Sequence, residues 1–146
     1  MAFRSNALKM IIYRSKFQIV EYDEDASMLR ETFSRATANY DVESFKNDFD
    51  ALTEAVLKFK GKVLSQCLLI DMRSFLYSVL PDLKSWHKEH VYPGIIEMGI
   101  REMAVINTPY VFGSVSAAQV FEQYKDSIPE ILIFCDENSA LEWLSE

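Results

Sequence analysis

One apolar stretch near the middle of the chain limits the folds that are open to it. From Val63 to Ile70 the sequence VLSQCLLI is almost continuously apolar, and it ends at Asp71. It is far shorter than the roughly 20 residues that a membrane-spanning helix needs. Runs of this length suit an interior strand of a parallel sheet, because such a strand is buried on both faces. The stretch therefore predicts an α/β protein, with further strands beside it and helices over it.

The most regular helical pattern comes just before this strand. Asp41–Lys60 carries an apolar stripe at spacings of three and four, with Asp41 as the N-cap and Gly61 as the C-terminal stop. The residues of the stripe are Phe45, Phe49, Leu52, Val56 and Phe59. The opposite face is polar and is expected to be solvated: it carries Lys46, Asp48, Asp50, Glu54 and Lys58.

The other segments predict strands that alternate with helices. Met10–Tyr13 and Phe17–Tyr22 are rich in β-branched and aromatic residues and predict a hairpin. Further strands are expected at Met103–Ile106 and Ile131–Cys135. Helices are expected at Glu24–Ala36, at Pro81–Ile96 with an interruption at Pro93-Gly94, at Val115–Tyr124, and after Asp136. This order predicts one domain over residues 1–146, with a single mixed, largely parallel five-stranded sheet, an N-terminal hairpin and flanking helices.

The charge of the chain argues against binding to nucleic acid. The net charge is −7, whereas a protein that neutralises phosphates usually presents a basic patch. Residues 1–20 carry four basic residues and no acidic one, so the net charge of this segment is +4 and that of the remainder is −11. A basic strand at the edge of the sheet explains this segment better than a targeting sequence does.

The two cysteines, Cys67 and Cys135, both fall in strand-like runs. Buried free thiols in a reducing compartment are the expected state, with a disulfide between neighbouring strands as the lesser alternative. Neither a membrane span nor a signal-peptide core is recognisable in the sequence. These features together predict a cytoplasmic protein.

Several stretches resemble the STAS-like domains, which are related to the bacterial anti-sigma-factor antagonists. The resemblance covers most of the chain and is closest to small stand-alone bacterial relatives of unassigned function. It rests on the stretches FQIVEYD, ESFKNDF, LLIDMRSFLYSVLPDLKSW, VSAAQVFEQY and ALEWL. It implies a small mixed sheet flanked by helices, which acts by binding another protein or a small ligand rather than by catalysis.

The chain departs from that family at one functional point. The antagonists carry a phosphorylatable Ser at the start of the helix after the middle strand, whereas the matching stretch here is VLPDLKSW. Ser74 and Ser78 lie nearby, but neither matches the motif. The departure puts regulation by phosphorylation at this point in doubt.

The best candidate site follows the central strand. Ligands of open α/β sheets tend to bind beyond the carboxyl ends of the strands. There, Asp71 and Arg73 can hold a polar ligand between walls formed by Tyr77 and Trp86, with His87 close by. The alternative is structural: Asp71 accepts hydrogen bonds from the turn and pairs with Arg73.

Other patterns carry less chemistry. His87 and His90 are three residues apart, but no further metal ligands have matching spacing, so no metal site is expected. No nucleophile elbow or phosphate-binding Gly loop occurs, and no catalytic residue or cofactor is assigned. Tyr92, Tyr110 and Phe112 are the candidates for an exposed apolar interaction surface.

Three functions stay open on this evidence. The first is a non-enzymatic binding module for a protein partner or a second copy of the chain. The second is a small-ligand binder that uses the pocket at Asp71 and Arg73. An enzyme is the weakest alternative, because no paired catalytic groups are visible.

Overall fold

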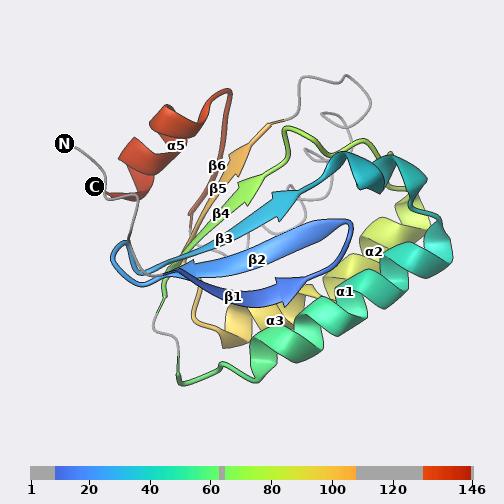
Figure 1. Ribbon diagram of the computed structural model, residues 1–146, viewed down its shortest axis with the longest axis horizontal. Helices are drawn as coiled ribbons and strands as arrows, with labels where there is room; N and C mark the ends of the chain where they lie inside the picture. Colours follow the sequence, from blue (N-terminus) through green and yellow to red (C-terminus); the bar gives the residue numbers. More distant parts are fainter. Residues whose placement is uncertain (1–8, 63–64, 108–129, 146) are drawn as a thin grey trace.

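In the part of the chain that the structure describes, six strands lie side by side in the order in which they occur in the sequence (Figure 1). The structure is a computed structural model that describes residues 9–62, 65–107 and 130–145. Its strands are β1 (Lys9–Arg14), β2 (Gln18–Asp23), β3 (Met28–Phe33), β4 (Cys67–Asp71), β5 (Glu102–Ile106) and β6 (Glu130–Phe134).

The sheet changes character at β3. The pairs β1–β2 and β2–β3 are antiparallel, and the pairs β3–β4, β4–β5 and β5–β6 are parallel. The mixed α/β class predicted from the sequence is therefore confirmed. The described residues form six strands rather than five, and the antiparallel part is a three-stranded meander rather than a hairpin.

The additional strand replaces an expected helix. Glu24–Ala36 was expected to be helical, but residues 24–27 form a turn in which Ser27 has a φ of 50°, and Met28–Phe33 then forms β3. Met28, Leu29 and Phe33 fit a helical stripe, yet Leu29, Glu31 and Phe33 also alternate as a strand does. The segment is a strand because it pairs with both β2 and β4, and tertiary contacts override such a short local pattern.

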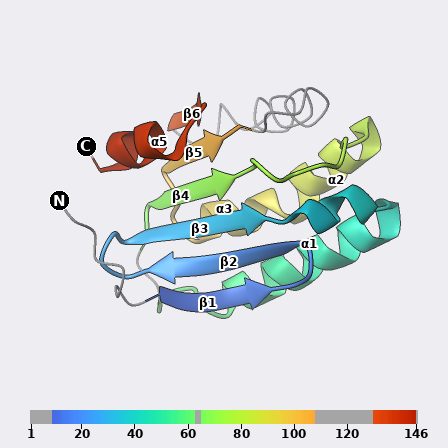
Figure 2. The same cartoon turned by 45° about the horizontal axis from the view of Figure 1, so that its top comes forward.

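Two groups of helices cover the two faces of the sheet (Figure 2). One face carries α1 (Val42–Leu57), α2 (Pro81–His90) and α3 (Tyr92–Glu97), and the other carries α5 (Glu137–Leu144). A short 3-10 helix, Arg35–Asn39, leads from β3 to α1. The expected helix at Val115–Tyr124 lies outside the described residues.

Local sequence signals fix the ends of these helices. The Asp41 carboxylate accepts a hydrogen bond from the backbone N–H of Ser44 at 2.7 Å, which forms the expected N-cap of α1. The helix ends at Leu57, before the expected Lys60, and Gly61 follows with a φ of +82°. The expected interruption near Pro93 is the boundary between α2 and α3, and Asp136 caps α5 as predicted.

Alternation along β4 separates two cores. Leu68 and Ile70 belong to the large core beneath α1, α2 and α3, whereas Leu69 packs in a smaller core with Ala104 and Ala140 beneath α5. The central strand is therefore buried on both faces, as the apolar run predicts. Residues of the candidate site can therefore contact one another only if their side chains lie on the same face of the sheet.

The two cysteines are free, as expected. Cys67 is half-buried, and its Sγ lies 3.5 Å from Oε1 of Glu102. Burial and this carboxylate raise the pKa of the Cys67 thiol to about 11, so it stays protonated at neutral pH. Cys135 is exposed, which corrects the expectation that both thiols are buried.

Candidate functional site

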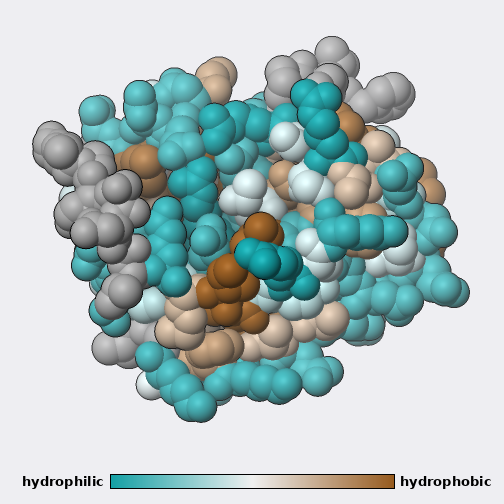
Figure 3. All heavy atoms as spheres, in the orientation of Figure 1, coloured by the Kyte–Doolittle hydropathy of each residue, from teal (hydrophilic) through white to brown (hydrophobic). Residues whose placement is uncertain are grey.

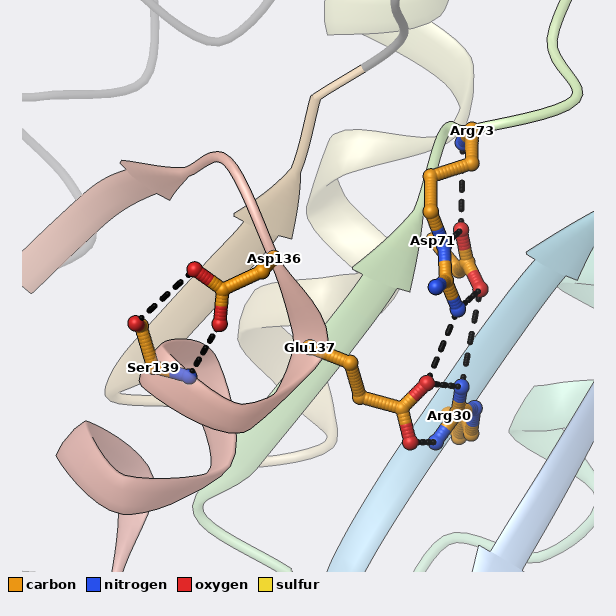
Figure 4. Close-up of polar contacts among 6 residues, drawn as sticks. All are labelled: Arg30, Asp71, Arg73, Asp136, Glu137 and Ser139. Atoms are coloured by element: carbon orange, nitrogen blue, oxygen red, sulfur yellow. Dashed lines mark hydrogen bonds and ion pairs between the residues drawn. The ribbon is translucent and has the colours of Figure 1, made fainter.

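The corner predicted at the end of β4 is an ion-pair network (Figure 4). Arg73 donates from Nε and Nη2 to the two carboxylate oxygens of Asp71, at 3.0 and 2.7 Å. The same Nη2 donates to Glu137 at 2.8 Å, and Arg30 of β3 donates to Glu137 from both terminal nitrogens, at 2.9 and 3.2 Å. Ion pairs thus link four charged groups, which come from β3, β4, the loop after β4 and α5.

Pairing keeps both carboxylates of this network ionised. Burial alone would raise the pKa of Asp71, but hydrogen bonds from Arg73 outweigh it and lower that pKa below its usual value. Hydrogen bonds from Arg30 lower the pKa of Glu137. The backbone N–H of Arg73 also donates a hydrogen bond to Asp71 at 3.1 Å. The structural interpretation of Asp71 expects this contact within the turn. The geometry suits an attachment of α5 to the sheet better than a polar ligand site.

The aromatic residues expected to form the walls of that site lie on the other face of the sheet. Tyr77 and Trp86 pack against the large core, where both contact the ring of Phe45. Asp71 follows Leu69 on the face that carries α5. The sheet separates the two halves of the predicted pocket, so these residues do not form one site.

The two histidines also have separate surroundings. The exposed ring of His90 stacks on Trp86, with centroids 4.8 Å apart. His87 is buried and meets Phe49 edge to face at 5.2 Å. Among the described residues, no cluster of three or more His, Cys, Asp or Glu side chains is arranged to hold a metal ion.

The expected interaction surface is not found as described. Tyr92 is only 7% exposed, so it does not belong to an exposed patch. Tyr110 and Phe112 lie outside the described residues. On the outer strand β1, however, Met10 and Ile11 are 44% and 46% exposed, and apolar atoms gather over β1 and β2 in Figure 3.

A cavity of about 90 Å³ lies within the large core, between the sheet and the three helices on that face. Its walls are mostly apolar side chains, among them Val20, Leu29, Phe33, Leu68, Ile70, Phe45, Phe49, Leu52 and Ile95. Polar side chains in its lining come from Glu31 of β3, Thr53 of α1 and His87 of α2. A concave apolar space with a few polar groups is the usual form of a small-molecule site.

Glu31 is the most unusual of these polar groups. Its side chain is buried, and its Oε2 has no hydrogen-bond partner among the described residues. Burial, with a smaller contribution from the charge of Asp48, raises the pKa of Glu31 to about 8. At neutral pH Glu31 is therefore mainly an uncharged carboxylic acid, which can both donate and accept a hydrogen bond.

Asp48 provides the charge next to Glu31 and has partners of its own. Its carboxylate accepts hydrogen bonds from the hydroxyls of Tyr13 and Tyr40, both at 2.6 Å, and from the Gln18 amide at 2.8 Å. Burial and the contact with Asp48 raise the pKa of both tyrosines above the usual value. The expectation that Asp48 lies on a solvated helix face is therefore wrong.

His87 is uncharged at neutral pH. Burial lowers the pKa of this imidazole to about 3. The described polar groups that line the cavity are therefore neutral near pH 7, and no cationic side chain is among the described lining residues.

Sequence reasoning identified His87 but missed Glu31 and Asp48. Glu31 stands between Leu29 and Phe33 at strand spacing, and this alternation would have placed it on the apolar face once β3 was recognised. Asp48 is three residues after Phe45 and four before Leu52, which is the spacing of the buried stripe.

Comparison with protein-family models, with curated proteins and with solved structures finds no match to this chain. Within the described ranges, every helix is too short or too polar to cross a membrane.

Proposed function

We propose that this protein is a non-enzymatic binding domain that holds a small, largely apolar molecule between its sheet and α1, α2 and α3. The observation that carries the proposal is the cavity of about 90 Å³, which lies next to a buried carboxylic acid with an oxygen that has no described partner. Well-packed cores contain few voids larger than a water molecule, and each void forfeits packing energy. A bound molecule would restore those contacts.

The volume limits the size of the ligand. An engineered apolar cavity of about 150 Å³ accommodates benzene. A cavity of about 90 Å³ therefore suits a molecule smaller than benzene, or one end of a longer molecule.

The resemblance to STAS-like domains adds to this proposal, since it implies binding rather than catalysis. We include in the proposal that the chain is a STAS-like module from the bacterial cytoplasm. The ligand site would then lie in the core, on the opposite face of the sheet from Asp71.

A direct test uses 2-methylpropene, an apolar molecule smaller than benzene, and NMR titration of the protein. We expect saturable shifts of methyl groups that line the cavity, such as those of Leu68 and Ile70. Leu68→Phe should abolish these shifts by filling the space. The matched control is Leu69→Phe, because Leu69 is the next residue on β4 but packs on the opposite face. The absence of saturable shifts in the unmodified protein, both with this alkene and with its ketone analogue acetone, would refute the proposal.

A protein partner or a second copy of the chain is the second candidate, and the exposed side chains of Met10 and Ile11 on β1 favour it. An outer strand can pair with another strand by backbone hydrogen bonds. Native mass spectrometry tests this candidate: a dimer that Ile11→Lys dissociates would support it, whereas a monomer at micromolar concentration would argue against self-association.

A further inference from the structure

We propose that the ligand carries an uncharged oxygen acceptor, such as the carbonyl of a ketone, aldehyde or ester, which accepts a hydrogen bond from the Glu31 side chain. This inference rests on the proposed function and specifies the chemical class of the molecule. It assigns to Glu31 the role of the polar contact within an otherwise apolar site.

The position of Glu31 carries the inference. The residue comes from β3, lines the cavity, and is only 8% exposed. Its Oε2 has no described hydrogen-bond partner, and a buried polar atom in that state carries a free-energy cost. A ligand oxygen in the cavity would remove this cost, and a pure hydrocarbon would not.

The protonation of Glu31 agrees with a neutral acceptor. Because burial raises the pKa of Glu31 to about 8, this side chain has a hydroxyl to donate at neutral pH. A ligand carbonyl can only accept, so the two groups are complementary.

The surrounding groups disfavour charged ligands. No Lys or Arg is among the described residues that line the cavity. Asp48 lies close enough to affect the titration of Glu31, so an anion would be repelled without compensation from those residues. A ligand ammonium would need several acceptors, but the two Asp48 oxygens already accept hydrogen bonds from Tyr13, Tyr40 and Gln18.

Four probes with the same number of non-hydrogen atoms separate these classes: acetone, 2-methylpropene, acetate and propylammonium. The first two differ mainly by replacement of the carbonyl oxygen with a methylene group. NMR titrations of the unmodified protein near pH 6 should give saturable binding of the ketone and the alkene, and none of the two ions.

Variants at Glu31 identify the hydrogen bond. Glu31→Met, which removes the donor, should weaken binding of acetone about tenfold relative to 2-methylpropene. Glu31→Gln keeps an N–H donor and should retain most of the preference for the ketone. If Glu31→Met leaves the ratio of the two affinities unchanged, the inference is wrong, although the proposed function survives as long as the alkene binds.

A pH titration tests the same contact without a substitution. Ionisation of Glu31 removes its donor, so the ratio of ketone to alkene affinity should fall several-fold between about pH 6 and about pH 9. The other titratable groups that face this region are Asp48, Tyr13, Tyr40 and His87, and the pKa shifts of the two tyrosines and of His87 place their titration outside this range. A constant ratio would contradict the inference. Tight binding of acetate or propylammonium would overturn it, and failure of all four probes would overturn the proposed function as well.

Discussion

Arg73 meets Asp71 through two parallel hydrogen bonds, and both residues reach the last helix through Glu137 and Arg30. The Asp71 side chain is 7% exposed, whereas that of Arg73 is 46% exposed, so solvent screens only one end of the pair. The network therefore joins a buried carboxylate at the end of β4 to the surface at the start of α5.

We expect Asp71→Asn to lower the free energy of unfolding by about 2 kcal/mol, because it leaves the half-buried guanidinium of Arg30 and the exposed guanidinium of Arg73 with only the Glu137 carboxylate between them. Glu97→Gln is the control, since it breaks an ion pair with Lys60 in which both side chains are at least half exposed. That change should cost no more than about 0.5 kcal/mol. Equal effects in urea unfolding would show that the network adds nothing beyond a surface pair.

Asp48 should matter more for stability than its position on α1 suggests. Asp48→Ala leaves the hydroxyls of Tyr13 and Tyr40 and the Gln18 amide without their acceptor, so we expect a loss of at least about 3 kcal/mol. Asp50→Ala, at an exposed position on the same helix, should change stability by about 0.5 kcal/mol or less. Chemical unfolding of both variants measures the difference, and a small effect at Asp48 would mean that water replaces its carboxylate.

Substitution of neighbouring leucines on β4 should have unequal costs. Leu69 is fully buried in the small core, so Leu69→Phe should cost about 1–3 kcal/mol through overpacking. Leu68 faces the cavity, so Leu68→Phe should cost less than about 1 kcal/mol. Thermal unfolding compares the two variants, and the reverse order would indicate that the cavity closes in solution.

Two buried groups give the stability a distinct pH dependence. The pKa of Glu31 rises from 4.5 to about 8 on folding, so the folded state keeps a proton that the unfolded state loses. Stability should then fall as the pH rises through this range, by up to about 1.4 kcal/mol per pH unit. The pKa of His87 falls from 6.5 to about 3, so its contribution is lost as the pH falls from about 6.5 to about 3.

The two contributions oppose each other between about pH 4.5 and 6.5, where we expect them to cancel. Urea unfolding of the unmodified protein and of Glu31→Gln over about pH 5 to 9 provides the test. The variant should lose the decline above about pH 6.5. Parallel curves for the two proteins would show that Glu31 titrates normally in the folded state.

The sequence predicts those parts of the fold that have strong local patterns. The apolar run ending at Ile70 and the stripe from Phe45 to Leu52 both occupy the expected elements, because burial along them is continuous enough to be read locally. The short pattern at Met28–Phe33 fits either type of element, and only pairing with β2 and β4 decides it.

The candidate site was harder to predict than the fold. Asp71 and Arg73 pair as the structural alternative anticipated, but the face that each side chain occupies depends on the register of β4 within the sheet. Tyr77 and Trp86 follow in sequence and were therefore expected in the same site, yet the chain has crossed to the other side of the sheet by then. Proximity in sequence is a poor guide to a shared pocket when a sheet lies between the elements.

The strand order has a consequence for the way the protein is made. From β2 onward, each described strand pairs with the described strand before it, so none of them has to be inserted between two that are already paired. A ribosome delivers the chain from its N-terminus, and domains can begin to fold during synthesis. The meander from β1 to β3 can therefore form first and offer β3 as the template for β4, after which the sheet grows by one strand at a time in the order of translation.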